Sequence, residues 1–144
     1  MTSSSEHEVV SVIIPCYNHT HFLGEAIASV INQTYPHIET IVVDDGSTDH
    51  SAQVAAAYSS VRYIQQNNFG LSRSRNVGLS HSKGTYIVFL DADDCLFPDA
   101  INIGLRALAS RNDCVLTFGL FVNVGLNQHI HKLSRDTNYG YKEL

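Results

Sequence analysis

Two short acidic segments in this 144-residue chain could hold a cation or a phosphorylated ligand. They are 44–47 (Asp-Asp-Gly-Ser) and 91–94 (Asp-Ala-Asp-Asp), and each directly follows an apolar run of strand length. Tyr17 and Asn18 follow a third such run. Converging carboxylates repel one another unless a cation, a hydrogen-bond donor or a basic side chain compensates. Oxygen ligands on a tight turn suit Mg²⁺ or Mn²⁺, which share their other positions with water and substrate phosphates.

Each of these features also has a purely structural interpretation. Asp-Gly-Ser is a common turn in which Ser47 or Asp49 could cap a helix, and 91–94 could cap the helix that follows it. In the functional interpretation, Asp45 accepts a hydrogen bond from a base N–H while Tyr17 stacks on the base. The alternative that Tyr17 only packs against its neighbours stays open.

Two arginines could add a phosphate contact. Arg73 and Arg75 lie near the start of a predicted helix, where charge and the helix dipole together attract anions. A solvated helix face would also explain them, and only one of them needs to be functional.

The elements that must position these residues are predicted from the spacing of apolar residues. We expect strands over Val9–Ile14, Ile38–Val43, Val61–Ile64, Tyr86–Leu90 and Cys114–Val122, and helices from Thr20 (as N-cap) to Gln33, from the 44–49 turn to Tyr58, over Leu71–Ser80 and from Pro98 to Ser110. Alternating strands and helices predict an α/β fold with a mostly parallel sheet covered by helices on both faces. Ligands of such sheets gather at the carboxyl ends of the strands.

Composition and the ends of the chain limit the possible functions. The net charge is −5, the pI is about 5.8, and the nine Lys and Arg residues are scattered, so no nucleic-acid footprint is visible. No stretch approaches the ~20 apolar residues of a membrane-spanning helix. We expect a disordered polar tail over residues 1–8 and one domain over residues 9–144. Because Gly125–Leu144 is polar and without period, we also expect that domain to be truncated at its C-terminus.

Four segments in order resemble the family 2 glycosyltransferases. They are 12–18 (VIIPCYN), 41–49 (IVVDDGSTD), Gly70 with 75–78 (RNVG), and 89–94 (FLDADD). The resemblance covers about Val9 to Ser110. It implies the GT-A fold, a nucleotide-sugar donor that is usually a UDP-sugar, and an inverting displacement assisted by Mn²⁺ or Mg²⁺.

The resemblance also implies a donor site at the motif positions, formed by Pro15, Tyr17, Asn18, Asp44, Asp45, Arg75, Asn76 and Asp91, with Asp93 as the metal ligand. Pro15, Tyr17 and Asp45 line the base pocket, and Asp44 lies beside them. Asp91 faces the ribose or sugar, and Asp93 holds the metal that bridges the diphosphate.

The general base of an inverting enzyme has no matching motif here, and neither Asp113 nor Asp136 is convincing. We therefore expect the donor-binding part of a longer enzyme, located in the cytoplasm or at the inner face of the membrane, with peripheral membrane association through regions outside this chain. The expected acceptor is a carbohydrate or a lipid-linked sugar, as in polysaccharide synthesis.

Two other functions are compatible with part of this pattern. A haloacid-dehalogenase-like phosphatase also places Asp-x-Asp at a strand end, but after an early strand, and it would leave the loops of Tyr17 and Asp45 unexplained. A non-catalytic nucleotide-binding module would bind the donor and do no chemistry. Turnover separates that module from an enzyme.

Overall fold

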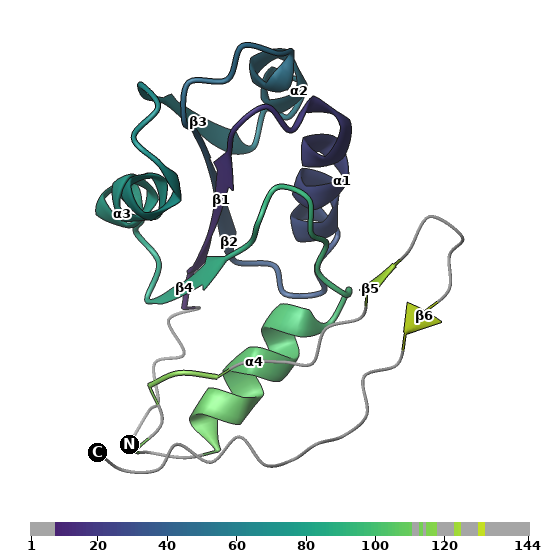
Figure 1. The fold of residues 1–144 in the computed structure, drawn as a ribbon. Helices are drawn as coiled ribbons and strands as arrows, with labels where there is room; N and C mark the ends of the chain where they lie inside the picture. The colour runs from purple at the N-terminus through teal and green to yellow at the C-terminus, as the bar shows by residue number, and fades with distance from the viewer. Residues whose placement is uncertain (1–7, 111–112, 114, 118–122, 125–129, 132–144) are drawn as a thin grey trace.

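The computed structural model describes residues 8–110, 113, 115–117, 123–124 and 130–131. Its strands are β1 (Val10–Cys16), β2 (Ile38–Asp44), β3 (Val61–Gln65), β4 (Tyr86–Phe89), β5 (Asn123–Val124) and β6 (Ile130–His131), and its helices are α1 (Thr20–Ile31), α2 (Ser51–Ala56), α3 (Leu71–His81) and α4 (Ala100–Ala109). The first four strands form one parallel sheet in the order β3-β2-β1-β4. Figure 1 shows α3 on one face of this sheet and α1 and α2 on the other. The predicted α/β architecture is confirmed.

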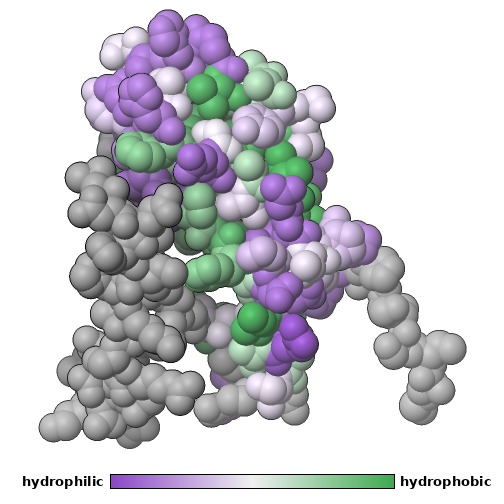
Figure 2. Space-filling model, turned by 90° about the vertical axis from the view of Figure 1, so that its right-hand side faces the viewer, coloured by the Kyte–Doolittle hydropathy of each residue, from purple (hydrophilic) through white to green (hydrophobic). Residues whose placement is uncertain are grey.

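The central strands β1 and β2 are buried on both faces because helices cover both, whereas the edge strands β3 and β4 are only partly buried. All seven residues of β1 are buried. Alternate residues of β1 and β2 point in opposite directions. One set joins the core beneath α1 and α2, and the other, which includes Ile13, Ile41 and Val43, packs with Val77 of α3. Figure 2 views the α1 and α2 face, which is hydrophilic at its upper end and carries more apolar residues below.

Pro15 is accommodated in the central strand because its neighbour ends early. The pairing of β4 with β1 runs only from Val10 to Ile13, and the Leu90 N–H then donates to the Ile13 carbonyl. A proline has no N–H to give a ladder, so it is tolerated where one partner strand has already diverged. This divergence separates the chain after β4 from β1 near the predicted site.

Helix α3 approaches the sheet closely at Gly78. A Cβ atom at this position would lie 2.3 Å from Cγ2 of Ile13 in β1. We therefore expect Gly78→Ala to lower the free energy of unfolding by about 1–3 kcal/mol, the usual cost of overpacking. Urea unfolding measures this loss. Gly24→Ala in α1 is the matched control, because its nearest heavy atoms lie at 3.6 Å and alanine favours a helix. Equal stability of the two variants would contradict the close approach.

Several predicted boundaries differ from the structure. Thr20 is the first residue of α1, and the N-cap is His19, whose side chain makes no cap hydrogen bond. Helix α4 begins at Ala100, two residues after Pro98. Residues 115–117 are not in a strand, and the rest of the predicted strand 114–122 lies outside the described residues.

The segment after Gly125 also differs from its prediction. We expected no element there, but Ile130–His131 pairs antiparallel with Asn123–Val124. The predicted tail falls outside the described residues except for Glu8, whose carbonyl accepts a hydrogen bond from the Tyr35 hydroxyl. No helix in the described part of the chain is long and apolar enough to cross a membrane.

Candidate donor-binding site

The loops after β1 and β2 are tied together by hydrogen bonds. The N–H of Asn18 donates to Oγ of Ser47 (2.9 Å), and the N–H of Thr48 donates to Oδ1 of Asn18 (2.8 Å). Asn18 takes a left-handed backbone with φ of 56°, which asparagine tolerates better than most residues. Tyr17 lies next to this fixed residue with 46% of its surface exposed. The tyrosine ring is therefore carried on a well-held loop and is open to a ligand.

Asp44 is buried at the end of β2. It is 1% exposed; its Oδ1 accepts the N–H of Ser47 (2.7 Å), and its Oδ2 accepts the hydroxyl of Tyr63. Burial and this hydrogen bond to Asp44 raise the pKa of Tyr63. Asp44 thus organises the turn from within, and contact with a ligand would require its side chain to move.

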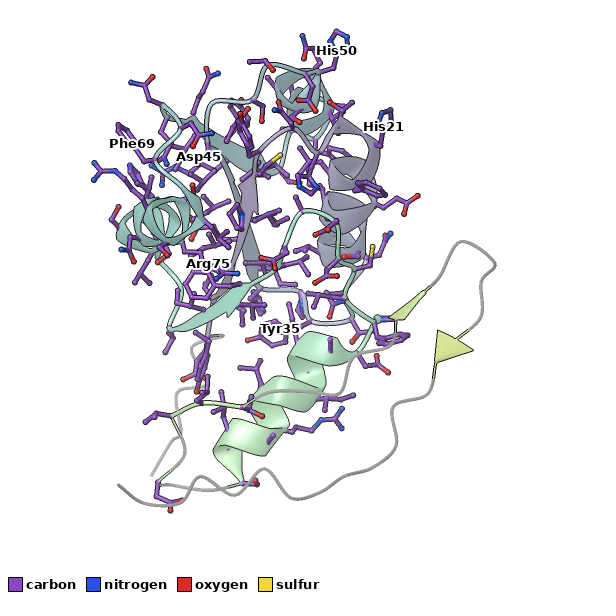
Figure 3. All side chains as sticks on the ribbon, viewed as in Figure 1. His21, Tyr35, Asp45, His50, Phe69 and Arg75 are labelled. Atoms are coloured by element: carbon purple, nitrogen blue, oxygen red, sulfur yellow. The ribbon has the colours of Figure 1, made fainter. Side chains whose placement is uncertain are left out.

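Asp45 holds the loop between β3 and α3. Its Oδ1 accepts the Gln66 amide (2.6 Å) and the N–H of Phe69 (2.9 Å), and its Oδ2 accepts the N–H of Gly70 (2.8 Å). Burial opposes ionisation of this carboxyl, but the hydrogen bonds from Phe69, Gln66 and Gly70 outweigh it and lower the pKa of Asp45. Gly70 has a φ of 91°, a conformation in which glycine is unstrained. Figure 3 shows Asp45 and Phe69 close together beside α3.

An open hollow of about 640 Å³ lies beside this loop, and its wall includes Gly46, Ser47, Gln66, Asn67 and Phe69. Phe69 is 57% exposed, and the guanidinium of Arg73 lies 4.7 Å from its ring centroid. Planar, half-exposed groups of this kind suit a flat ligand. A smaller hollow of about 210 Å³ lies around Tyr35 and Ile38, at the start of β2 and away from the acidic loops.

Arg75, unlike Arg73, faces the second acidic segment. Its Nη2 lies 2.8 Å from Oδ1 of Asp91, and its guanidinium lies 5.8 Å from the ring centroid of Phe89. Figure 3 shows Arg75 projecting from α3 toward β4. The Nε of Arg75 is buried and has no hydrogen-bond partner among the described residues. The structure therefore brings Arg75 and Asp91 together, while Asn76 lies exposed on α3.

The segment 91–94 forms a tight turn closed by the N–H of Asp94 and the carbonyl of Asp91 (3.0 Å). Asp93 and Asp94 are exposed. Burial and the negative charges of Asp93 and Asp91 raise the pKa of Asp94. No three His, Cys, Asp or Glu side chains in the described part of the chain converge to hold a metal. Repelling carboxylates on one turn nevertheless fit a cation that takes one or two protein ligands and completes its shell with phosphate oxygens.

The alternative that this acidic segment caps a helix is wrong. Helix α4 starts at Ala100, six positions after Asp94, and its N-cap Asp99 makes no side-chain cap hydrogen bond. The chain between them is fastened instead to Gln33, which follows α1. Nε2 of Gln33 donates to the carbonyl of Phe97 (2.7 Å), and its Oε1 accepts the N–H of Ile101 (3.2 Å). This clamp fixes the chain that leaves the acidic turn.

Sequence reasoning missed Gln33 and Gln66 as supports of the site, and it assigned Asp49 only half of its role. The N-cap of α2 is His50, not Asp49, but Asp49 still supports the start of this helix because its Oδ1 accepts the N–H of Ser51 (3.0 Å). Its Oδ2 also accepts the N–H of Thr20 (3.0 Å) at the start of α1. No local pattern reveals such a bond, because the two residues are 29 positions apart.

Comparison with known proteins identifies the family to which this chain belongs. The family model described as glycosyl transferase family 2 matches residues 11–143. The chain belongs to this family. It is 42% identical over 96 residues to glycosyltransferase GlyA of Streptococcus pneumoniae, which covers 64% of this chain and 14% of GlyA.

Two solved structures resemble this chain in fold. TarS 1–349 of S. aureus in complex with UDP has a TM-score of 0.66 and 30% identity, over 71% of this chain and 32% of that one. The mannosyltransferase PcManGT of Pyrobaculum calidifontis, in complex with GDP-Man and Mn²⁺, has a TM-score of 0.62 and 25% identity, over 69% and 31%. These neighbours confirm the GT-A fold. The family 2 chain spans less than a third of each of the three proteins.

Proposed function

We propose that this chain binds a UDP-sugar through the loops after β1, β2 and β4, and that it belongs to a metal-dependent, inverting glycosyltransferase. The observation that carries the proposal is that Tyr17 and Asp45 lie on neighbouring loops at one end of a parallel sheet, with Arg75 and the acidic turn along the same side. A UDP complex of TarS and a GDP-Man and Mn²⁺ complex of PcManGT support a nucleotide-sugar ligand. Those two complexes carry different bases, so the fold alone does not fix the base.

The base and ribose are assigned to the first two loops. Tyr17 stacks on the base beside Pro15, and Asp45 accepts its N–H. Asn18 holds the loop that carries Tyr17, and Asp44 holds the turn that carries Asp45 by accepting the N–H of Ser47. The hydrogen bonds from Phe69, Gln66 and Gly70 keep the pKa of Asp45 low despite its burial, so the carboxylate is ionised at neutral pH and accepts a donor from the ligand.

The diphosphate is assigned to the side formed by α3 and the acidic turn. Asp93, exposed on the turn, holds Mn²⁺ or Mg²⁺, and Asp91 faces the ribose or sugar. When bound, the metal neutralises charge that builds on the departing nucleoside diphosphate. Arg75 pairs with Asp91, and its Nε, which has no hydrogen-bond partner among the described residues, is assigned to a further acceptor. Asn76 follows Arg75 on α3. The acceptor, a carbohydrate or lipid-linked sugar, and the general base that activates its hydroxyl are assigned outside the described residues.

Calorimetric titration of UDP into the chain, with and without Mn²⁺, tests the proposal. We expect Mn²⁺ to tighten UDP binding at least about tenfold, which corresponds to ~1.4 kcal/mol. Asp93→Ala should remove this increment and leave metal-free UDP binding unchanged.

The control is Asp99→Ala, the same change at an exposed residue beyond the turn. It should keep the Mn²⁺ effect. If wild type binds UDP equally with Mn²⁺ and with a chelator, the metal assignment is wrong. If the folded chain binds no UDP at all, the donor site is wrong. Binding without sugar transfer or hydrolysis would favour the non-catalytic module.

A further inference from the structure

The hydrogen bonds that Asp45 already makes determine what it can still accept. A carboxylate offers about four lone-pair positions, two on each oxygen. Oδ1 uses both of its positions, for Nε2 of Gln66 and the N–H of Phe69, and Oδ2 uses one, for the N–H of Gly70. One acceptor position on Oδ2 is left. A ligand can therefore present one N–H to Asp45, and a second N–H beside it finds Oδ1 fully occupied.

Asp45 makes three hydrogen bonds, of which the one from Gln66 alone comes from a side chain. The Ser74 hydroxyl also acts on this carboxylate and lowers its pKa, but its hydrogen is donated to the carbonyl of Gly70. Nε2 of Gln66 lies 2.6 Å from Oδ1 of Asp45 and 3.2 Å from Oγ of Ser74, and that hydroxyl in turn donates to the carbonyl of Gly70 (3.2 Å). Ser74 is 1% exposed. Turning the Gln66 amide over would direct its oxygen at the carboxylate, so the orientation is fixed by charge. The Oε1 atom is buried and has no partner among the described residues. The orientation of the amide therefore rests on the contacts of Nε2 with Asp45 and Ser74.

We infer that Gln66 is a specificity-determining residue, which blocks the second acceptor edge of Asp45 and so restricts the site to bases that present a single N–H. This inference rests on the proposed donor site. Uracil presents one imide N–H between two carbonyls and fits the remaining position. Guanine presents two adjacent N–H donors, which pair best with both oxygens of a carboxylate, and Gln66 holds one of those oxygens. A donor left without a partner in a buried site weakens binding enough to discriminate between the two bases.

The test compares UDP and GDP affinities, both with Mn²⁺, in wild type and Gln66→Met. Methionine keeps the length of the side chain and removes the N–H donors. We expect wild type to prefer UDP at least about thirtyfold. In Gln66→Met one position on each oxygen of Asp45 becomes free, so UDP binding should weaken about threefold to tenfold while GDP binding tightens. The ratio of the two affinities should fall at least about tenfold.

Two further variants keep the result interpretable. Gln53→Met, the same change at an exposed position of α2 on the other face of the sheet, should leave the ratio at its wild-type value. Ser74→Ala removes the second partner of the Gln66 amide and should shift the ratio in the same direction by a smaller factor, which covers the case in which Gln66→Met does not fold.

The possible outcomes distinguish the selectivity role of Gln66 from the existence of the donor site. If wild type binds UDP with the Mn²⁺ increment but Gln66→Met and Ser74→Ala change both affinities by the same factor, the selectivity role of Gln66 is overturned and the donor site stands. A wild-type preference for GDP would overturn it as well. If wild type binds neither nucleotide, the proposed donor site itself has failed.

Discussion

Asp45→Ala is expected to weaken UDP binding at least about 100-fold, or ~2.7 kcal/mol. Hydrogen bonds to charged groups contribute about 1.5–3 kcal/mol each. The variant loses the bond proposed for the base, and it also frees the three donors that fasten the 66–70 loop. Titration of UDP against the folded variant measures the loss.

Pyrophosphate with Mn²⁺ is the discriminating control ligand, because it carries the diphosphate and lacks the base. If Asp45 contacts the base, pyrophosphate affinity should change less than threefold in Asp45→Ala. Equal losses for UDP and pyrophosphate would mean that Asp45 acts only by holding the loop. Asp45→Asn should lie between wild type and Asp45→Ala, since its amide keeps one acceptor oxygen but turns an NH₂ group toward neighbouring N–H donors.

The sheet could be predicted from the sequence because strands covered on both faces leave a simple signal. The apolar runs that became β1 and β2 need no alternation when helices lie on both sides, and the polar segments after them fall at the carboxyl ends of parallel strands. The placement of the site residues at one edge of the sheet followed from this topology. Tyr17 and Asp45 were predicted to be neighbours for that reason, and their loops are hydrogen-bonded together.

The hydrogen-bond partners could not be predicted, because they depend on contacts distant in sequence. Gln66 reads as one residue of a polar loop, and only the fold brings its amide to Asp45, 21 positions earlier. The clamp of Gln33 on Phe97 spans 64 positions. Which of Arg73 and Arg75 faces the second acidic segment could not be predicted either. Both lie near the start of α3, and they differ only in the direction of their side chains relative to β4.

The errors in the predicted helix boundaries arose from contacts between residues distant in sequence. Thr20 has the side chain of an N-cap, yet the cap bond to its N–H comes from Asp49, so the helix starts at Thr20 rather than after it. Pro98 was expected to open α4, but the carbonyls of Phe97 and Pro98 accept hydrogen bonds from Gln33 and Thr34, which delays the first helical turn. In both cases a tertiary contact replaced the expected local one.

Asp49→Ala is expected to lower the free energy of unfolding by about 2–4 kcal/mol, because one carboxylate accepts backbone N–H groups at the start of two helices. Oδ2 accepts the N–H of Thr20 (3.0 Å), and Oδ1 accepts the N–H (3.0 Å) and hydroxyl (2.6 Å) of Ser51. Loss of one cap typically costs about 1 kcal/mol, and the negative charge near two helix N-termini adds to this. Urea unfolding at neutral pH measures the change.

The pH dependence identifies the charge as the source of this stability. Burial opposes ionisation, but the hydrogen bonds from Ser51 and Thr20 outweigh it and lower the pKa of Asp49. A lowered folded-state pKa gives stability that is present above the unfolded value of about 4 and is lost as pH falls through the folded value. The difference between wild type and Asp49→Asn should therefore shrink on acidification below about pH 4.

Asp49→Asn isolates the ionised form, since the amide keeps one oxygen acceptor and loses the charge. A stability difference that stays constant down to acid pH would mean that packing, and not the ionised cap, links the two helices. If the capping account holds, Asp49→Ala should also weaken UDP binding. Helices α1 and α2 begin immediately after the loops that carry Tyr17 and Asp45, so loosening their first turns loosens the positions of both side chains.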